Sequence, residues 1–161
     1  MARMTAAVDR NPLGVGQRTS IRTILLATDL SPASEEATRQ AIELCRLLQA
    51  SLLVVNVIDS DEKVGDRARI GSQTRRIDQH RAQREPRLLE IVERGRASGV
   101  YSSFLLWTGE AGPGIVAAAE AEQAGMVVVG THGRGRAGRF LLGSVSEYVV
   151  YNSEVPVLVA R

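Results

Sequence analysis

Residues 126–144 read MVVVGTHGRGRAGRFLLGS, and this stretch decides the fold. Its first four residues form an apolar run typical of a buried strand, and the glycine pair Gly130 and Gly133 follows directly. Nine further residues lead to Gly143 and Ser144, where a helical pattern begins. Glycines let backbone N–H groups approach a ligand, and a helix start offers unpaired donors at its positive dipole end. The stretch therefore predicts a strand–loop–helix unit that binds an anion such as a phosphate.

Three arginines in this loop, Arg134, Arg136 and Arg139, add fixed positive charge, and we place Arg134 among the binding residues. A Walker-type phosphate loop is excluded, because it needs a lysine among its glycines and Lys63 is the only lysine of the chain. His132 reads as a loop residue or a hydrogen-bonding neighbour of the site rather than as a catalytic base.

Outward from the loop, apolar runs alternate with helical patterns along the chain. Five apolar runs predict buried strands at about 21–28, 52–58, 102–107, 126–129 and 155–160. Four helices are expected, at about 32–49, 86–96, 115–123 and 145–152, and the second could start earlier. Ser31 is the predicted N-cap of the first helix. A turn at 109–114 precedes the third helix, and Gly125 is its predicted C-cap. This order predicts an α/β fold, an open parallel five-stranded sheet with helices on both faces and right-handed crossovers.

Composition is that of one globular domain. The chain has 161 residues, of which 44% are hydrophobic and 24% charged, and we divide it into a flexible extension at 1–20 and a domain at 21–161. The net charge of +2 argues against nucleic acid or a membrane as a partner. No apolar run approaches a membrane span of about 20 residues, and the N-terminus lacks the apolar core of a secretory signal, so a cytoplasmic location is expected. The single cysteine, Cys45, predicts a buried thiol without a disulfide partner.

The carboxyl ends of the predicted strands supply further candidates, because ligands of open α/β sheets lie there, where the strand order reverses. The first strand ends in Ala27, Thr28 and Asp29. The Asp29 carboxylate can accept hydrogen bonds from ribose hydroxyls, although it could also simply cap the first helix or form a salt bridge. Val57, near the end of the second strand, offers an apolar contact for a base. Together with the glycine loop, these residues predict a nucleotide site.

Three segments resemble the universal stress protein family: ILLATDLS at 24–31, LLVVNVID at 52–59, and the stretch from VVVGTHG at 127 to VPVLVA at 155–160. The similarity covers about residues 22–161. The nucleotide-binding branch of that family has Gly, two residues, Gly, nine residues, then Gly-Ser or Gly-Thr, and the chain has this whole pattern. The resemblance implies a Rossmann-like fold of the adenine nucleotide alpha hydrolase type, with sheet order 3-2-1-4-5 and dimerisation through the last strand.

The resemblance also implies residue roles. Positions near the adenine and ribose correspond to Ala27, Asp29 and the base contact Val57. Positions under the ribose and phosphates correspond to Val129 and Gly130. The phosphate cradle corresponds to Gly133, Gly143, Ser144 and Val145. One departure is Ala27, which stands where some members have proline or valine.

Three functions follow from these patterns. The first is a regulatory stress-response protein that binds ATP, with AMP or ADP as further ligands, and hydrolyses it slowly or not at all; Ser144 and Asp29 could help hold Mg²⁺. The second is an ATPase or nucleotidyl transferase, disfavoured because no residue stands out as a water-positioning base. The third is a nucleotide-free adaptor dimer, disfavoured by the intact loop. A homodimer joined through the strand at 155–160 is expected as well.

Overall fold

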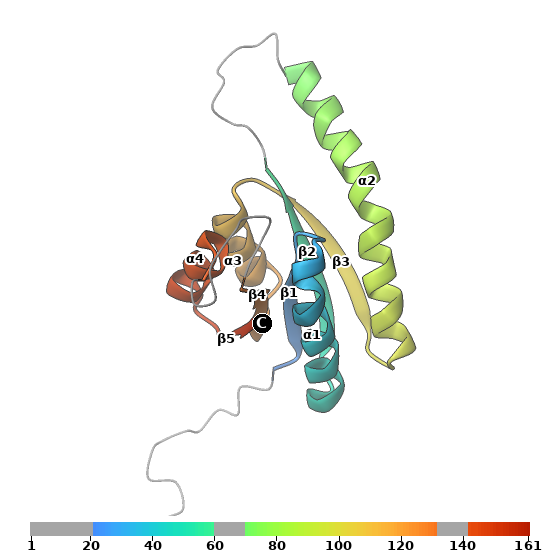
Figure 1. Ribbon diagram of the computed structural model, residues 1–161, viewed down its shortest axis with the longest axis vertical. Helices are drawn as coiled ribbons and strands as arrows, with labels where there is room; N and C mark the ends of the chain where they lie inside the picture. The colour runs from blue at the N-terminus through green and yellow to red at the C-terminus, as the bar shows by residue number, and fades with distance from the viewer. Residues whose placement is uncertain (1–20, 60–69, 132–141) are drawn as a thin grey trace, which may run out of the picture.

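The computed structural model describes residues 21–59, 70–131 and 142–161, and the side chains of 70–77 lie outside that description. Strands and helices alternate along the chain (Figure 1): β1 Thr23–Ala27, the 3-10 helix η1 Pro32–Ser34, α1 Glu35–Leu48, β2 Ser51–Ile58, α2 Ile70–Ala97, β3 Ser102–Thr108, α3 Ala111–Ala121, β4 Met126–Gly130, α4 Ser144–Asn152 and β5 Val157–Ala160. The strands form one parallel sheet in the order β3-β2-β1-β4-β5. This confirms the predicted α/β class and strand order.

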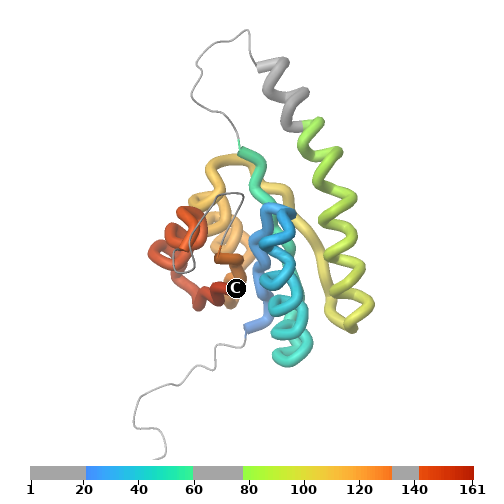
Figure 2. Tube along the Cα trace, in the orientation of Figure 1, coloured from blue at the N-terminus to red at the C-terminus, as the bar shows by residue number. Residues whose placement is uncertain are grey.

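Each face of the sheet is covered by two helices. Figures 1 and 2 show α1 and α2 on one side and α3 and α4 on the other. Alternate residues of a strand point to opposite faces, so Ile24 and Leu26 of β1 pack in the core beneath α1 and α2, whereas Leu25 and Ala27 pack against α3 and α4. Burial on both faces explains why the strands read as continuous apolar runs.

Of the two starts left open for α2, the earlier one is correct. The helix begins at Ile70, well before Pro86, and Pro86 lies inside it. Proline removes one backbone donor, and this is tolerated because the helix around Pro86 faces solvent. Beyond Pro86, Leu88 and Val92 are fully buried, whereas residues 78–83 are all exposed. The spacing of apolar residues in the sequence therefore indicates only the half of α2 that packs against the sheet.

The prediction for α3 needs correction, because the helix starts at Ala111 inside the stretch expected to be a turn. Gly114 serves close packing rather than a turn: a Cβ there would lie 3.1 Å from both Trp107 Cδ1 and Val57 Cγ1. The C-cap is Glu122 rather than Gly125, and Gln123 after it takes the left-handed conformation with φ 51°. Gly125 donates its N–H to the Thr23 carbonyl at 2.8 Å.

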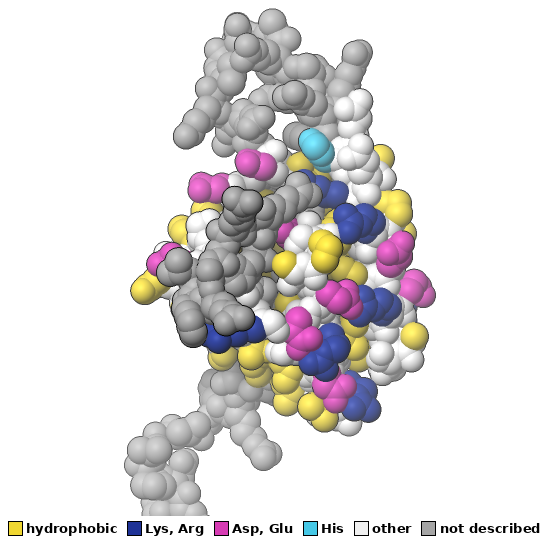
Figure 3. All heavy atoms as spheres, viewed as in Figure 1, with side chains coloured by type: hydrophobic (Ala, Val, Ile, Leu, Met, Phe, Trp, Pro, Cys, Tyr) yellow, Lys and Arg dark blue, Asp and Glu magenta, His cyan; other side chains and the backbone are white. Residues whose placement is uncertain are grey.

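The outer faces of α1 and α2 are charged and solvated. Figure 3 shows basic and acidic side chains interleaved over this side of the molecule. Exposed ion pairs account for many of them: Arg39–Glu36, Arg46–Glu43, Arg94–Glu35 and Arg96–Glu93. Beneath them Cys45 is 1% exposed, as expected, and burial raises the pKa of its thiol to about 12. Across the described ranges, no helix combines the length and apolar character needed to cross a membrane.

Candidate functional site

The turn after β1 is held by its own side chains. The N–H of Thr28 donates to the Val55 carbonyl at 3.0 Å, which continues the sheet pairing. The Thr28 hydroxyl accepts a hydrogen bond from the Leu30 N–H at 3.0 Å and lies 2.9 Å from Ser34 Oγ. Leu30 has φ 62°, an uncommon value for a residue other than glycine. These bonds hold the turn in a conformation that it would rarely adopt alone.

Asp29 has one carboxylate oxygen engaged and one without a partner. Oδ1 accepts the Ser31 N–H at 2.9 Å, so this oxygen caps the chain just before η1. Oδ2 is buried and has no hydrogen-bond partner among the residues that the structure describes, and the same holds for Ser31 Oγ. Ser31 is the N-cap of η1, with Pro32 after it, but its hydroxyl makes no capping bond, contrary to expectation, and α1 itself has Ser34 as its N-cap. A buried acceptor left without a donor is costly, and this is typical of a site that a ligand completes.

The end of β2 carries a polar network that was not predicted from the sequence. Asn56 is 2% exposed, and its Nδ2 donates to the Thr28 carbonyl at 2.7 Å. Arg84 of α2 donates from Nη1 to Asn56 Oδ1 at 2.7 Å and to the Val57 carbonyl at 2.8 Å. One sequence signal was present, since Asn56 is the lone amide in the apolar run LLVVNVI. Its partner Arg84 gave no such signal.

The end of β4 and the start of α4 lie together. Ser146 Oγ donates to the Gly130 carbonyl at 2.7 Å, and the Gly143 N–H donates to the Thr131 carbonyl at 2.8 Å. Gly143 is the N-cap of α4, and the first helical bond runs from the Glu147 N–H to the Gly143 carbonyl at 2.9 Å. The N–H groups of 144–146 therefore have no partner within the helix. These donors and the helix dipole make the start of α4 an electropositive end beside β4.

Most of the predicted site residues meet at the carboxyl edge of the sheet. β1 and β4 are paired neighbours, and the strand order reverses between them. The residues that the structure places at this edge are Ala27, Thr28, Asp29, Val57, Val129, Gly130, Gly143, Ser144 and Val145. Gly133, Arg134 and the rest of the loop at 132–141 lie outside the described residues. No group of three histidine, cysteine or acidic side chains able to hold a metal occurs in the part of the chain that is described.

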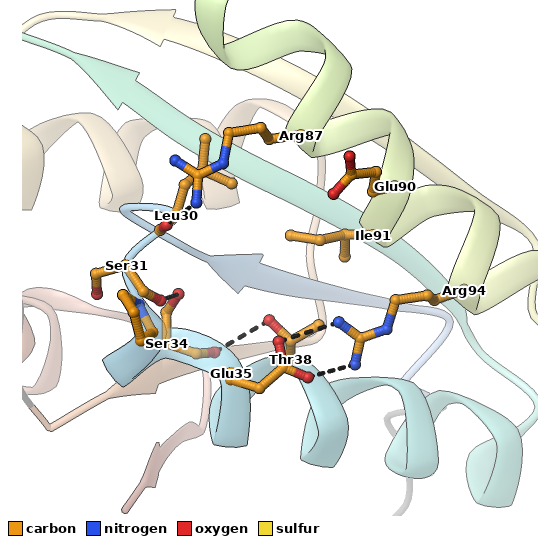
Figure 4. Close-up of a pocket in the computed structure, with 10 residues that line it drawn as sticks. Leu30, Ser31, Ser34, Glu35, Thr38, Arg87, Glu90, Ile91 and Arg94 are labelled. Atoms are coloured by element: carbon orange, nitrogen blue, oxygen red, sulfur yellow. Dashed lines mark hydrogen bonds and ion pairs between the residues drawn. The ribbon is translucent and has the colours of Figure 1, made fainter.

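A separate pocket of about 190 Å³ opens between the start of α1 and α2. Figure 4 shows Arg87 reaching from α2 to the Leu30 carbonyl and Arg94 meeting Glu35 of α1. The Arg94 hydrogen bonds lower the pKa of the Glu35 carboxyl. None of the predicted binding residues is among those lining this pocket, which are Leu30, Ser31, Pro32, Ser34, Glu35, Thr38, Arg87, Glu90, Ile91 and Arg94. The pocket lies on the α1–α2 side of the turn, away from the junction of β1 and β4.

Residues 20–161 match the model of the universal stress protein family. The universal stress protein MJ0531 of Methanocaldococcus jannaschii is 31% identical over 138 residues, which cover 86% of this chain and 81% of that protein. The chain therefore belongs to the universal stress protein family, and the predicted resemblance is confirmed.

Solved structures agree with the fold. The universal stress protein UspA from Lactobacillus plantarum superposes with a TM-score of 0.79 at 22% identity, covering 88% of this chain and 98% of that one. The universal stress protein from Archaeoglobus fulgidus in complex with dAMP superposes with a TM-score of 0.62 at 24% identity, covering 87% and 98% of the two chains. At these identities the likeness supports the fold alone.

Proposed function

We propose that this chain binds an adenine nucleotide, ATP foremost, at the junction of β1 and β4 and acts as a nucleotide-dependent regulatory protein in the stress response. The observation that carries this proposal is the buried Oδ2 of Asp29, which lacks a partner among the described residues. A ribose supplies hydroxyl donors of the kind that this oxygen needs. The sugar would thus lie over the end of β1.

The start of α4 supports phosphates as the next part of the ligand. The N–H groups of 144–146 have no intrahelical partner, and the helix dipole favours negative charge there. Gly130 and Gly143 leave room for the backbone to approach the ligand, and Gly133 and Arg134 would extend the same cradle. Val57 would contact the base. A solved relative of the same fold is a complex with dAMP, which supports an adenine nucleotide as the ligand class.

Magnesium would reach this site with the phosphates. Mg²⁺ prefers oxygen ligands and commonly pairs one or two protein groups with phosphate oxygens and water. Asp29 and Ser144 have oxygens of the right kind, and the described residues hold no cluster of three ligands that would form a cage by themselves. Bound there, the ion would neutralise phosphate charge.

Occupancy rather than turnover is proposed to be the signal. Backbone donors and arginines hold phosphates in the ground state and in the transition state alike, and such uniform binding does not accelerate chemistry. The second candidate, an ATPase or nucleotidyl transferase, needs a group that positions the attacking water. Asp29 is the acidic residue at the strand junction, and it does not stand out as that group, because one of its oxygens already accepts the Ser31 N–H.

Calorimetric titration with ATP, ADP, AMP and adenosine tests the proposal. Gly143→Val is a suitable variant, because Gly143 has φ −67° and ψ 154°, an extended conformation open to any residue. The substitution keeps the N–H that bonds to the Thr131 carbonyl, but the added side chain should hold phosphates away from the N–H groups of 144–146. ATP should therefore lose about 1–3 kcal/mol of binding free energy, and adenosine should lose little. No heat with any adenine nucleotide would favour the adaptor function. Multiple turnover at roughly 1–10³ s⁻¹ would establish the enzyme instead.

A homodimer through β5 and a cytoplasmic location complete the proposal. β5 is the last strand in the sheet order, so one of its edges has no neighbour among the described strands. Val157, Leu158 and Val159 are half-buried there. An apolar edge strand invites pairing, and two copies of the same strand pair with two-fold symmetry.

A further inference from the structure

A chain of hydrogen bonds links α2 to the turn that carries Asp29. Arg84 Nη1 donates to Asn56 Oδ1 at 2.7 Å, and Asn56 Nδ2 donates to the Thr28 carbonyl at 2.7 Å. The Thr28 carbonyl belongs to the peptide bond that joins Thr28 to Asp29. The chain therefore ends one bond away from the residue proposed to bind the ribose.

The direction of this chain is chemically determined. A guanidinium can only donate and a carbonyl can only accept, so the Asn56 amide must turn its oxygen to Arg84 and its nitrogen to Thr28. Asn56 is 2% exposed and cannot exchange these partners freely for water. Without Arg84, the amide oxygen would lose the partner that fixes its orientation, and the bond to Thr28 would loosen with it.

A second arginine of α2 holds the other side of the same turn. Arg87 donates to the Leu30 carbonyl, as Figure 4 shows. Arg84 and Arg87 are three residues apart, so they lie on one face of the helix. Between Asp78 and Glu85 all described side chains are exposed except that of Arg84, which is half-buried. The two carbonyls that flank Asp29 are thus both tied to α2.

We propose that Arg84 is a positioning residue of the nucleotide site: acting through Asn56, it fixes the Thr28–Asp29 peptide and so the Asp29 oxygen that accepts the ribose hydroxyls. This inference rests on the proposed function. Arg84 acts through Asn56 and does not itself contact the ligand. The coupling between the two contacts is reciprocal: if Arg84 favours ligand binding to Asp29, a ligand bound to Asp29 stabilises the hydrogen bonds between α2 and the turn by the same free energy. α2 thereby becomes the element that senses occupancy.

The test compares ATP with 2′,3′-dideoxy-ATP, which lacks both ribose hydroxyls that Asp29 would bind. Wild type should bind ATP about tenfold more tightly, because hydrogen bonds to a charged acceptor are lost in the analogue. Arg84→Met should reduce this ratio to about twofold or less, because ATP loses its ribose hydrogen bonds to Asp29 and the analogue has none to lose. Arg94→Met is the matched control, since it removes the same charge from α2 at an exposed pair with Glu35 and should retain the full ratio.

Other outcomes separate the two proposals. If Arg84→Met retains the wild-type ratio, or if wild type binds both nucleotides equally, the positioning role is overturned while nucleotide binding stands. If wild type binds neither nucleotide, the proposed function itself fails. Asn56→Asp covers the case in which Arg84→Met does not fold. It keeps the size of the side chain and the acceptor for Arg84 but cannot donate to Thr28, so it should also reduce the ratio; a retained ratio would overturn the inference.

Discussion

Substituting Gly112 by alanine should destabilise the protein by pushing α3 away from α4. Gly112 is buried in the first turn of α3, against the side of α4 that carries Tyr148. A Cβ at Gly112 would lie 2.8 Å from Tyr148 Cγ, 2.9 Å from Cδ1 and 3.0 Å from Cβ. These separations are below ordinary contact, and one of the atoms is the Cβ, which cannot turn aside. The helices therefore have to separate.

The expected cost combines two opposing effects. Overpacking costs about 1–3 kcal/mol, and alanine regains up to about 1 kcal/mol over glycine in a helix. The net loss of about 1–2 kcal/mol lowers the melting temperature of a chain of this size by about 2–8 °C. Differential scanning calorimetry measures the shift. Because α4 begins at the proposed phosphate cradle, Gly112→Ala should also weaken ATP binding.

A double-mutant cycle isolates the contact. Tyr148→Ala removes the two ring atoms nearest to the new methyl group and keeps only the Cβ at 3.0 Å, so Gly112→Ala should cost clearly less in that background than in wild type. If Gly112→Ala melts at the wild-type temperature, or costs the same with and without the Tyr148 ring, close packing of α3 on α4 does not limit stability at this position.

Three further predictions concern other parts of the fold. Gly95→Ala places a Cβ 2.2 Å from Ser102 Oγ, so urea unfolding should show a loss of about 1–3 kcal/mol that Ser102→Ala partly restores; an unchanged midpoint would contradict the packing of α2. Burial raises the pKa of Cys45 to about 12 from 9.0. Its thiol therefore ionises first in the unfolded chain, and stability should fall as pH rises from 9 to 12, less so in Cys45→Ala; iodoacetamide labelling of the native protein at pH 9 would argue against this. Val157→Arg should convert a dimer to a monomer in light scattering, and a dimer of unchanged affinity would exclude pairing through β5.

The strands were predictable because burial on both faces leaves a signal in the sequence. Residues 126–129 lie in β4 between β1 and β5, and their side chains pack alternately into the two cores on either side of the sheet. The first residues of the helices were harder to predict than the strands. The N-terminal half of α2 contributes exposed side chains, and Pro86 imitates a helix start where the structure has a helix interior. Gly112 and Gly114 likewise resemble turn residues, but their role is close packing.

The candidate site was predictable where it depends on position along a strand. Asp29 follows β1, and parallel strands align their carboxyl ends, so its place at the sheet edge needed no knowledge of contacts. Its unpartnered oxygen depends on Oδ1 bonding to Ser31, which local sequence does not determine. The Arg84–Asn56 bond joins residues 28 apart, and it arises only once α2 packs on β2. Contacts of this kind depend on the tertiary structure, so the local sequence does not predict them.

The most direct test of the account is a calorimetric titration of ATP into wild type and Asp29→Asn. The amide keeps the shape of the side chain and an oxygen for the Ser31 N–H, but it offers a neutral NH₂ donor where the carboxylate would accept a ribose hydroxyl. Hydrogen bonds to charged groups contribute about 1.5–3 kcal/mol, so Asp29→Asn should weaken ATP binding at least tenfold without lowering the melting temperature of the ligand-free protein. Equal affinity of the two proteins for ATP would contradict it.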